Sequence, residues 1–161
     1  MLNLRSIRPE DNAAVARVVR TVMPEFGCVG EGFSITDPEL EDMFSAYSGA
    51  RAGFFVLEDP HGGEVVGVAG YDQLTAGPED MCELRKMYIL PGSRGRGGGK
   101  QLIRACLLGA RLDGYRRMYL ETVDSMTRAA GLYAANGFSY LEGPLGGTGH
   151  TGCDRFMVRD L

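Results

Sequence analysis

The sequence predicts a fold of the α/β class whose central β-sheet is mixed, as in α+β proteins. Helices are expected to flank this sheet on both faces. Three observations predict this fold. Apolar residues recur at helical spacing in some segments, whereas other segments are short and rich in β-branched and aromatic residues, as strands are. Segments 53–58 and 64–71 flank the turn sequence DPHGG and are therefore expected to form a hairpin. Strands and helices also alternate, which favours a mixed sheet with helices packed on its faces.

The individual elements follow from periodicity and from residues that end helices. A valine stripe at 15, 18, 19 and 22 predicts a first helix, which Pro24 ends because proline lacks an N–H and clashes with the preceding turn. Asp37 and Pro38 are expected to cap and begin a second helix. The expected order is strand 2–8, a helix opening at 9–11, loop 25–36, helix 37–47, strands 53–58, 64–71 and 82–90, a helix through 102–110, strand 117–122, helix 126–135, strand 138–140, glycine loop 142–152 and strand 153–158.

Length and composition limit the classes of protein that fit. The chain has 161 residues, 44% of them hydrophobic and 24% charged, which is typical of one globular domain spanning 1–161. No apolar run approaches the ~20 residues of a membrane span, and charge interrupts the N-terminus where a signal peptide would be apolar. We therefore expect a cytoplasmic protein without disulfides. The four cysteines form no CxxC pair and only two histidines are present, so we expect no metal site.

Charge and glycine are concentrated in one segment. The net charge of −4 argues against nucleic acid as a partner, because binding phosphates along a duplex requires a basic face. Glycine makes up 24 of the 161 residues, and five glycines fall between 92 and 99. The same region, 85–104, contains no acidic residue and six basic ones, namely Arg85, Lys86, Arg94, Arg96, Lys100 and Arg104.

This strand, glycine loop and helix predict a phosphate site. Backbone N–H groups at a helix N-terminus attract anions, and glycines let a phosphate approach them closely. A nucleoside triphosphate loop is disfavoured, because Arg94 stands where its first glycine belongs and Gln101 replaces the hydroxyl residue that binds magnesium. A dinucleotide site is also disfavoured, because Lys100 replaces its last small residue.

The remaining pattern is Arg/Gln-x-x-Gly-x-Gly/Ala, which Arg94, Gly97 and Gly99 match. With it the sequence resembles the GCN5-related N-acetyltransferase (GNAT) family over essentially the whole chain. Residues 7–11 (IRPED) are similar to the family's opening strand-to-helix step, and residues 83–91 (ELRKMYILP) to its central strand. Residues 131–138 (GLYAANGF) resemble its late helix.

The resemblance implies that acetyl-CoA is the co-substrate. It implies that the loop holds the pyrophosphate and that the backbone of Met87 and Ile89 pairs with the pantetheine arm, aided by a β-bulge or a splay of the strands. Where the family often has an asparagine seven residues before the late-helix tyrosine, this chain has Met126. The cofactor-binding residues expected in this way are Met87, Tyr88, Ile89, Arg94, Gly95, Arg96, Gly97, Gly98, Gly99, Lys100 and Met126.

Two residues are candidates for catalysis. Glu83 lies four residues before Met87, and strand alternation would put both side chains on one face, so Glu83 can act as base toward the thioester region or serve a structural or substrate-binding role. The Met87 N–H is a candidate to polarise the carbonyl. Tyr133, by resemblance, donates a proton to the departing thiolate, with core packing as the alternative.

The acceptor is expected to be a primary amine of a small molecule or amino acid, with no nucleic-acid or membrane partner and with a homodimer left open. His150, Cys153 and the loop 26–35 are candidates to line its pocket, and a cysteine nucleophile is disfavoured because no orienting group is evident. A non-catalytic acyl-CoA sensor is the alternative function, and a protein for another phosphorylated ligand a weaker one. His61, in a tight hairpin, is expected to be solvated.

Overall fold

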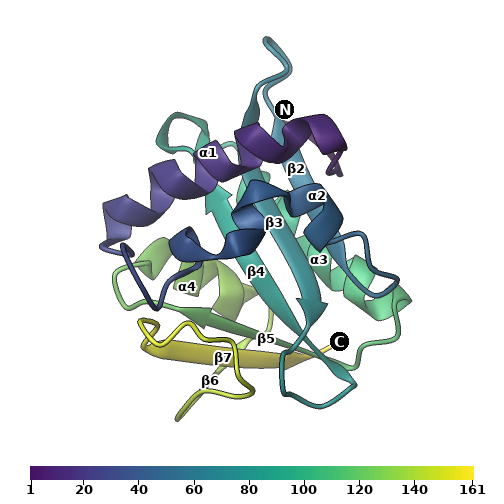
Figure 1. Cartoon of the computed structure of the whole chain (residues 1–161), viewed down its shortest axis with the longest axis vertical. Coiled ribbons are helices and arrows are strands. Elements are labelled where there is room, and N and C mark those ends of the chain that lie inside the picture. Colours follow the sequence, from purple (N-terminus) through teal and green to yellow (C-terminus); the bar gives the residue numbers. More distant parts are fainter.

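The computed structural model describes all 161 residues and contains one seven-stranded mixed sheet. The strand order is β1-β2-β3-β4-β5-β7-β6, and only β4 and β5 are parallel. Figure 1 shows the chain, whose elements are β1 (Asn3–Ser6), α1 (Asn12–Val22), α2 (Met43–Ala46), β2 (Gly53–Glu58), β3 (Val65–Gln73), β4 (Met81–Ile89), α3 (Gly98–Leu112), β5 (Arg117–Thr122), α4 (Thr127–Ala135), β6 (Ser139–Leu141) and β7 (Arg155–Asp160).

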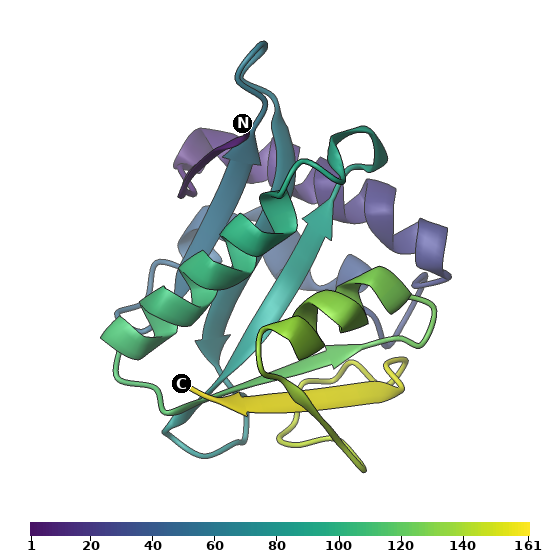
Figure 2. The same cartoon turned by 180° about the vertical axis from the view of Figure 1, so that it is seen from behind.

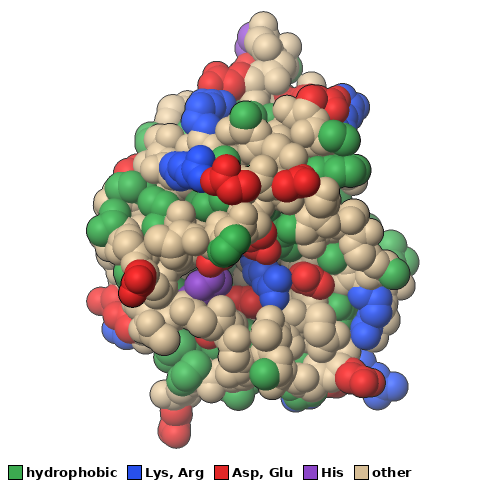
Figure 3. Space-filling view, viewed as in Figure 1, with side chains coloured by type: hydrophobic (Ala, Val, Ile, Leu, Met, Phe, Trp, Pro, Cys, Tyr) green, Lys and Arg blue, Asp and Glu red, His purple; other side chains and the backbone are tan.

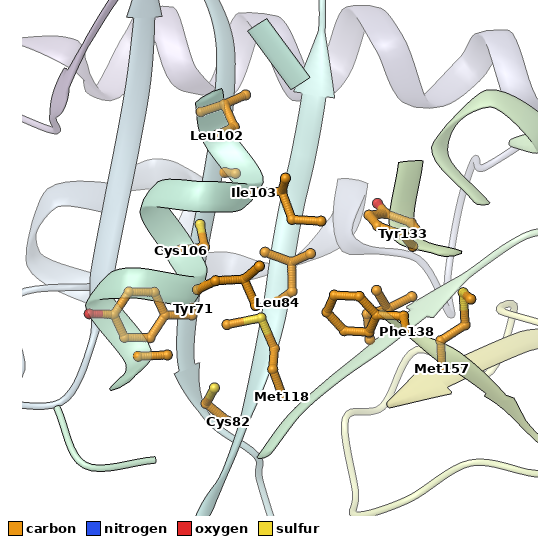
Figure 4. Close-up of a cluster of buried hydrophobic side chains, with 14 of the residues drawn as sticks. Tyr71, Cys82, Leu84, Leu102, Ile103, Cys106, Met118, Tyr133, Phe138 and Met157 are labelled. Atoms are coloured by element: carbon orange, nitrogen blue, oxygen red, sulfur yellow. The ribbon is translucent and has the colours of Figure 1, made fainter. Parts of the chain in front are cut away.

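Helices cover both faces of the sheet, as predicted. In Figure 1 α1 and α2 lie in front of the strands, and Figure 2 shows α3 and α4 on the opposite side. The four valines predicted to face the core from α1 are all buried. α3 buries Leu102, Ile103 and Cys106 against β2, β3 and β4, and Figure 4 shows this core with Tyr133 and Phe138 at its edge. The hydrophobic periodicity therefore orients the helices correctly.

β4 and β5 pair over three residues only. Residues 81–83 are in register with 117–119, and beyond that point the two strands diverge, as the different directions of β4 and β5 in Figure 2 show. β4 also carries a bulge, because its register with β3 shifts between Val68 and Gly70. Lys86 takes the extra position with a left-handed φ of 51°. The splay and the bulge, which the resemblance implied as alternatives, are both present and leave main-chain groups of β4 without a β5 partner.

The predicted helix over 37–47 is wrong in one respect. A 3-10 helix at Pro38–Glu41 and the short α2 are separated by Asp42, whose φ of −151° is not helical. The Asp42 carboxylate accepts a hydrogen bond from the Ser45 N–H at 3.1 Å, and the Asn12 side chain accepts one from the Phe44 N–H at 2.8 Å. These side-chain caps begin a new helical turn where a continuous helix was expected.

The first α-helix ends before Pro24, as predicted, and a 3-10 helix follows it directly. Residues Met23–Phe26 form a 3-10 helix that accommodates Pro24 near its start, and Gly27 ends it with a φ of 75°. Proline is tolerated in the first turn of a helix, because the N–H it lacks would have no partner there. None of the helices is both long enough and apolar enough to cross a membrane.

Candidate active site

The glycine loop joins β4 to α3 in a tight left-handed path. Gly95 and Gly97 have φ values of 77° and 80°, which residues with a Cβ rarely adopt. A Cβ at Gly98 would lie 2.7 Å from the Leu57 side chain, so the helix N-terminus is pressed against the core. The loop therefore holds the first N–H groups of α3 at a fixed place beside the end of β4.

A cleft of about 540 Å³ opens where β4 and β5 diverge. Residues of the β4 end, the glycine loop and the first turns of α4 line it. Of the predicted cofactor residues it contains Met87, Tyr88, Ile89, Arg94, Gly95, Gly99 and Met126, together with Tyr133. Its position at the carboxyl end of splayed strands and at a helix N-terminus suits an elongated ligand with an anionic end.

Four predicted cofactor residues lie outside the lining of this cleft, namely Arg96, Gly97, Gly98 and Lys100. Arg96 instead donates to the Asp59 carboxylate of the β2–β3 turn at 2.6 Å. Gly98 faces the core, as described above. The structure thus divides the predicted set into residues that face the cleft and residues that shape the loop behind it.

A segment that the sequence did not single out for this cleft also closes one side of it. Arg94 donates to both carboxylate oxygens of Glu25, at 3.0 and 3.1 Å, and to the Ile89 carbonyl at 2.9 Å. Ser125, before α4, donates to the Phe26 carbonyl at 3.0 Å. The 3-10 helix 23–26 therefore spans from the glycine loop to the start of α4.

A smaller pocket of about 50 Å³ adjoins the cleft. The two share Met87, Tyr88, Met126 and Tyr133, so they meet at this group of side chains. The further lining of the smaller pocket includes the predicted acceptor residues Phe33, His150 and Cys153, and Glu83.

His61 lies outside this site and is exposed in the β2–β3 turn, as predicted.

Glu83 is enclosed and linked to one cation. Its side chain is 4% exposed, and its Oε2 accepts a hydrogen bond from Arg85 Nε at 2.8 Å. Burial raises the pKa of the Glu83 carboxyl above its usual value, and the charge of Arg85 opposes that effect. The other oxygen of Glu83 accepts no hydrogen bond. Every fully enclosed side-chain oxygen in the chain has a hydrogen-bond partner, so this oxygen is not fully enclosed and is open to the pocket.

The prediction that Glu83 and Met87 share a face is wrong. Leu84 packs in the core under α3, so its neighbour Glu83 faces the other side of the sheet. The extra residue at the bulge then turns Met87 toward α3, where its side chain packs against that same core. Tyr88 takes the Glu83 face instead, against the core under α1.

Tyr133 is buried in α4 with its ring 6.0 Å from that of Phe138. Its hydroxyl makes no hydrogen bond within the chain, although the residue lines both pockets. Burial raises the pKa of this phenol above its usual value, so the group keeps its proton at neutral pH. The Tyr133 ring therefore packs in the core, while its hydroxyl is free to donate a hydrogen bond toward the pockets.

Cys153, which lines the smaller pocket, is not activated. Burial raises the pKa of the Cys153 thiol to about 12, and the next contribution comes from the charge of Glu121. A thiol must lose its proton to act as a nucleophile, so this environment disfavours that role, as the sequence analysis expected.

One charged residue beside Glu83, Glu121, was missed, and His150, expected to line the acceptor pocket, lies next to it. Ligand atoms of Glu83, Glu121 and His150 lie within 4.8 Å of one another, a spacing at which they can contact one cation together. His150 Nε2 also lies 3.0 Å from the Asp37 carboxylate, which raises the pKa of the imidazole. Alternation along 117–122 puts Glu121 on the Tyr119 side, but the register that brings it to β4 is not visible in the sequence.

Comparison with known proteins assigns the chain to a family. The family described as "Acetyltransferase (GNAT) family" matches residues 16–138. The uncharacterized N-acetyltransferase YjgM of Escherichia coli K12 is 40% identical over 98% of this chain and 94% of that protein.

Solved structures share the fold. A GNAT-family acetyltransferase from Staphylococcus aureus Mu50 matches with a TM-score of 0.84 and 22% identity, over 99% of both chains. The yncA protein from Salmonella typhimurium, solved with its cofactor acetyl-CoA, matches with a TM-score of 0.78 and 18% identity over 99% of this chain and 94% of that one. The chain therefore belongs to the acetyltransferase (GNAT) family and is an acyl-CoA-dependent N-acetyltransferase.

Proposed function

We propose that this enzyme transfers the acetyl group of acetyl-CoA directly to a primary amine of a small molecule or amino acid. The observation that carries the proposal is the junction of the two pockets. A cleft suited to an elongated anionic ligand meets a small pocket at Met87 and Tyr133, and the Glu83 carboxylate lines that pocket. A donor, an acceptor and two proton-transfer groups can therefore meet at one point.

The cofactor is proposed to lie along β4 with its pyrophosphate at the glycine loop. The N-terminus of α3 offers N–H groups and the positive end of the helix dipole to the phosphates. Beyond residue 83, β4 has no β5 partner, so the amide groups of the pantetheine arm can take the place of a neighbouring strand. This placement points the thioester toward the junction.

The chemistry requires two proton movements. The amine attacks the thioester carbonyl carbon, a C–N bond forms, and the C–S bond breaks with its electron pair going to sulfur. Glu83 takes the proton that the amine loses, a role for which burial raises its pKa in the useful direction. Tyr133 gives its proton to the thiolate, since its hydroxyl is otherwise unpartnered. An N–H of the β4 bulge, with Met87 the first candidate, polarises the carbonyl.

The test is an assay of free CoA released from acetyl-CoA in the presence of a panel of amines. We expect release above the rate of spontaneous hydrolysis with at least one small primary amine, together with the acetylated amine by mass spectrometry. Binding of acetyl-CoA without turnover for any acceptor would instead indicate that the chain does not transfer to small amines.

Tyr133→Phe is expected to lower turnover by about 10- to 10³-fold. The ring and its packing on Phe138 remain, so the fold and acetyl-CoA affinity should be retained. Phe138→Leu, which disturbs the same core without touching the hydroxyl, is the control. Unchanged turnover of Tyr133→Phe with chemistry rate-limiting would assign the phenol to packing alone.

A further inference from the structure

Glu121 is a carboxylate that makes no salt bridge, and the nearest cationic group, the His150 ring, is bound to Asp37. Glu121 lies partly buried in the smaller pocket, and its two oxygens accept hydrogen bonds from the hydroxyls of Tyr119 and Thr148, each at 2.8 Å. Both donors are neutral, and no Lys, Arg or His makes a salt bridge with this side chain. A half-buried carboxylate with no salt bridge is costly, so its position is suited to a cationic ligand.

The surroundings do not supply the missing charge. Arg85 is bound by Glu83 at 2.8 Å and by Asp72 at 3.4 Å. Lys86, whose side chain is 1% exposed, is bound by Asp37 and Glu39. With His150 counted as protonated, three cations meet five carboxylates in this cluster, which consists of Asp37, Glu39, Asp72, Glu83, Arg85, Lys86, Glu121 and His150. Figure 3 shows red and blue side chains gathered around one histidine on this face.

The geometry fits one nitrogen. Carboxylate oxygens of Glu83 and Glu121 lie no more than 4.8 Å apart, and a nitrogen between them can donate to both at about 2.8 Å. We propose that the acceptor enters as an ammonium ion bound between Glu83 and Glu121, that it gives one proton to solvent before it attacks as the neutral amine, and that this pair selects amines with no carboxylate on the carbon bearing the nitrogen. The inference rests on the proposed function and narrows its acceptor class.

The exclusion of an α-carboxylate follows from distance and pairing. Such a carboxylate lies about 3 to 4 Å from the amine nitrogen, which would bring it close to Glu83 and Glu121, where like charges repel strongly at low dielectric. The Arg85 and Lys86 side chains, which would otherwise attract it, already have carboxylate partners. Amines and amino amides avoid this repulsion, whereas free amino acids meet it.

The ligand atoms of Glu83, Glu121 and His150 could also hold a divalent cation. The surroundings of these three side chains favour the ammonium ion. His150 directs Nε2 to Asp37, so only its other ring nitrogen remains for a metal. A metal on Glu83 would also take the oxygen that faces the pocket, where the amine must arrive. Zinc binding is therefore an outcome that the experiment must separate.

The experiment compares ethylamine, alaninamide and alanine, which share the reacting amine and differ in the substituent on its carbon. Calorimetry measures binding to the enzyme with bound CoA, and CoA release from acetyl-CoA gives kcat/KM, both at pH 7 with EDTA. We expect kcat/KM for ethylamine and alaninamide to exceed that for alanine by about 10²-fold or more.

Glu121→Gln tests the residue itself. The amide keeps the size of the side chain and can still bond the Tyr119 and Thr148 hydroxyls, so the fold should be retained. We expect ammonium affinity to fall by about tenfold and the preference over alanine to shrink by a similar factor. Glu10→Gln removes the same charge from an exposed residue outside both pockets and should change neither quantity.

The outcomes separate the two proposals. Equal use of alanine and ethylamine, or an unchanged preference in Glu121→Gln, overturns the ammonium site while transfer to amines stands. Amine binding that depends on Glu121, without any CoA release, supports the site and rejects the proposed function. Absence of amine binding overturns the ammonium site, and zinc titrated without EDTA that binds only with Glu121 present then identifies a metal site in its place.

Discussion

Glu83→Gln is expected to lower turnover by about 100-fold or more, with little change in acetyl-CoA affinity. Glutamine keeps the shape of the side chain and removes the base, and Glu83 lines the smaller pocket but not the cofactor cleft. Steady-state kinetics with saturating acetyl-CoA measures the first effect, and calorimetry with acetyl-CoA measures the second. A hundredfold loss in both would place Glu83 in the fold instead of the chemistry.

The pH profile gives this prediction its sharpest form. The base acts only when ionised, and burial raises the pKa of Glu83, so wild-type activity should fall as the pH drops through that raised pKa. In Glu83→Gln that limb should disappear, and the residual rate should follow the fraction of neutral amine, rising with pH up to the pKa of the amine itself. Retention of the wild-type limb would contradict the role of Glu83 as base.

A control variant, Asp72→Asn, separates the loss of the base from the loss of an ion pair to Arg85. Glu83→Gln also takes a partner from Arg85, whose other carboxylate partner is Asp72 at 3.4 Å. Asp72→Asn removes that partner while leaving both pockets intact, because Asp72 lines neither. We expect near wild-type turnover for Asp72→Asn. A loss as large as that of Glu83→Gln would show that Arg85 is the group that matters.

Gly97→Asp is expected to weaken acetyl-CoA binding by about 100-fold. The residue precedes the first turn of α3, where the pyrophosphate is proposed to bind, and a Cβ there meets no atom within 4 Å. The carboxylate would therefore project into open space beside the N-terminus of α3 and repel the phosphates. Calorimetry with acetyl-CoA measures the change, and a thermal melt verifies the fold.

Two variants separate charge from backbone strain. Gly97→Ala imposes the same left-handed φ of 80°, at a cost of about 1 to 2 kcal/mol in stability, without adding charge. Gly62→Asp adds the same charge in the β2–β3 turn, where φ is unstrained and a Cβ meets no atom within 4 Å. Both should bind acetyl-CoA nearly as the wild type does. Full affinity in a folded Gly97→Asp protein would reject the loop as the pyrophosphate site.

The fold was predictable where one local signal dominates. The periodicity of the valine stripe was sufficient for α1, and α1 and the strand at 117–122 were both predicted correctly. The break at Asp42 was not, because it depends on Asn12, thirty residues away in sequence, which binds the Asp42 side chain and the Phe44 N–H. A local sequence pattern does not reveal helix caps that come from residues distant in the sequence.

The candidate site was likewise predictable only in part. Glu83 and Tyr133 were found from motifs, and the structure places both on the smaller pocket. The position of the bulge was not found, because the residue with positive φ is Lys86 and not a glycine. Glu121 was missed because a single sequence contains no information on the register of β5 against β4, which is parallel and joined through α3.

The short parallel pairing divides the sheet into two sub-structures. β1 to β4 form one antiparallel block and β5, β7 and β6 another, with three residue pairs between them. Amide hydrogens of β4 beyond this joint that face β5 should exchange with solvent faster than those bonded to β3, because they have no β5 partner to bond. In the proposed complex the pantetheine arm bonds to these same groups, so the co-substrate would complete the sheet. Exchange at this edge should then slow far more than elsewhere when acetyl-CoA is added.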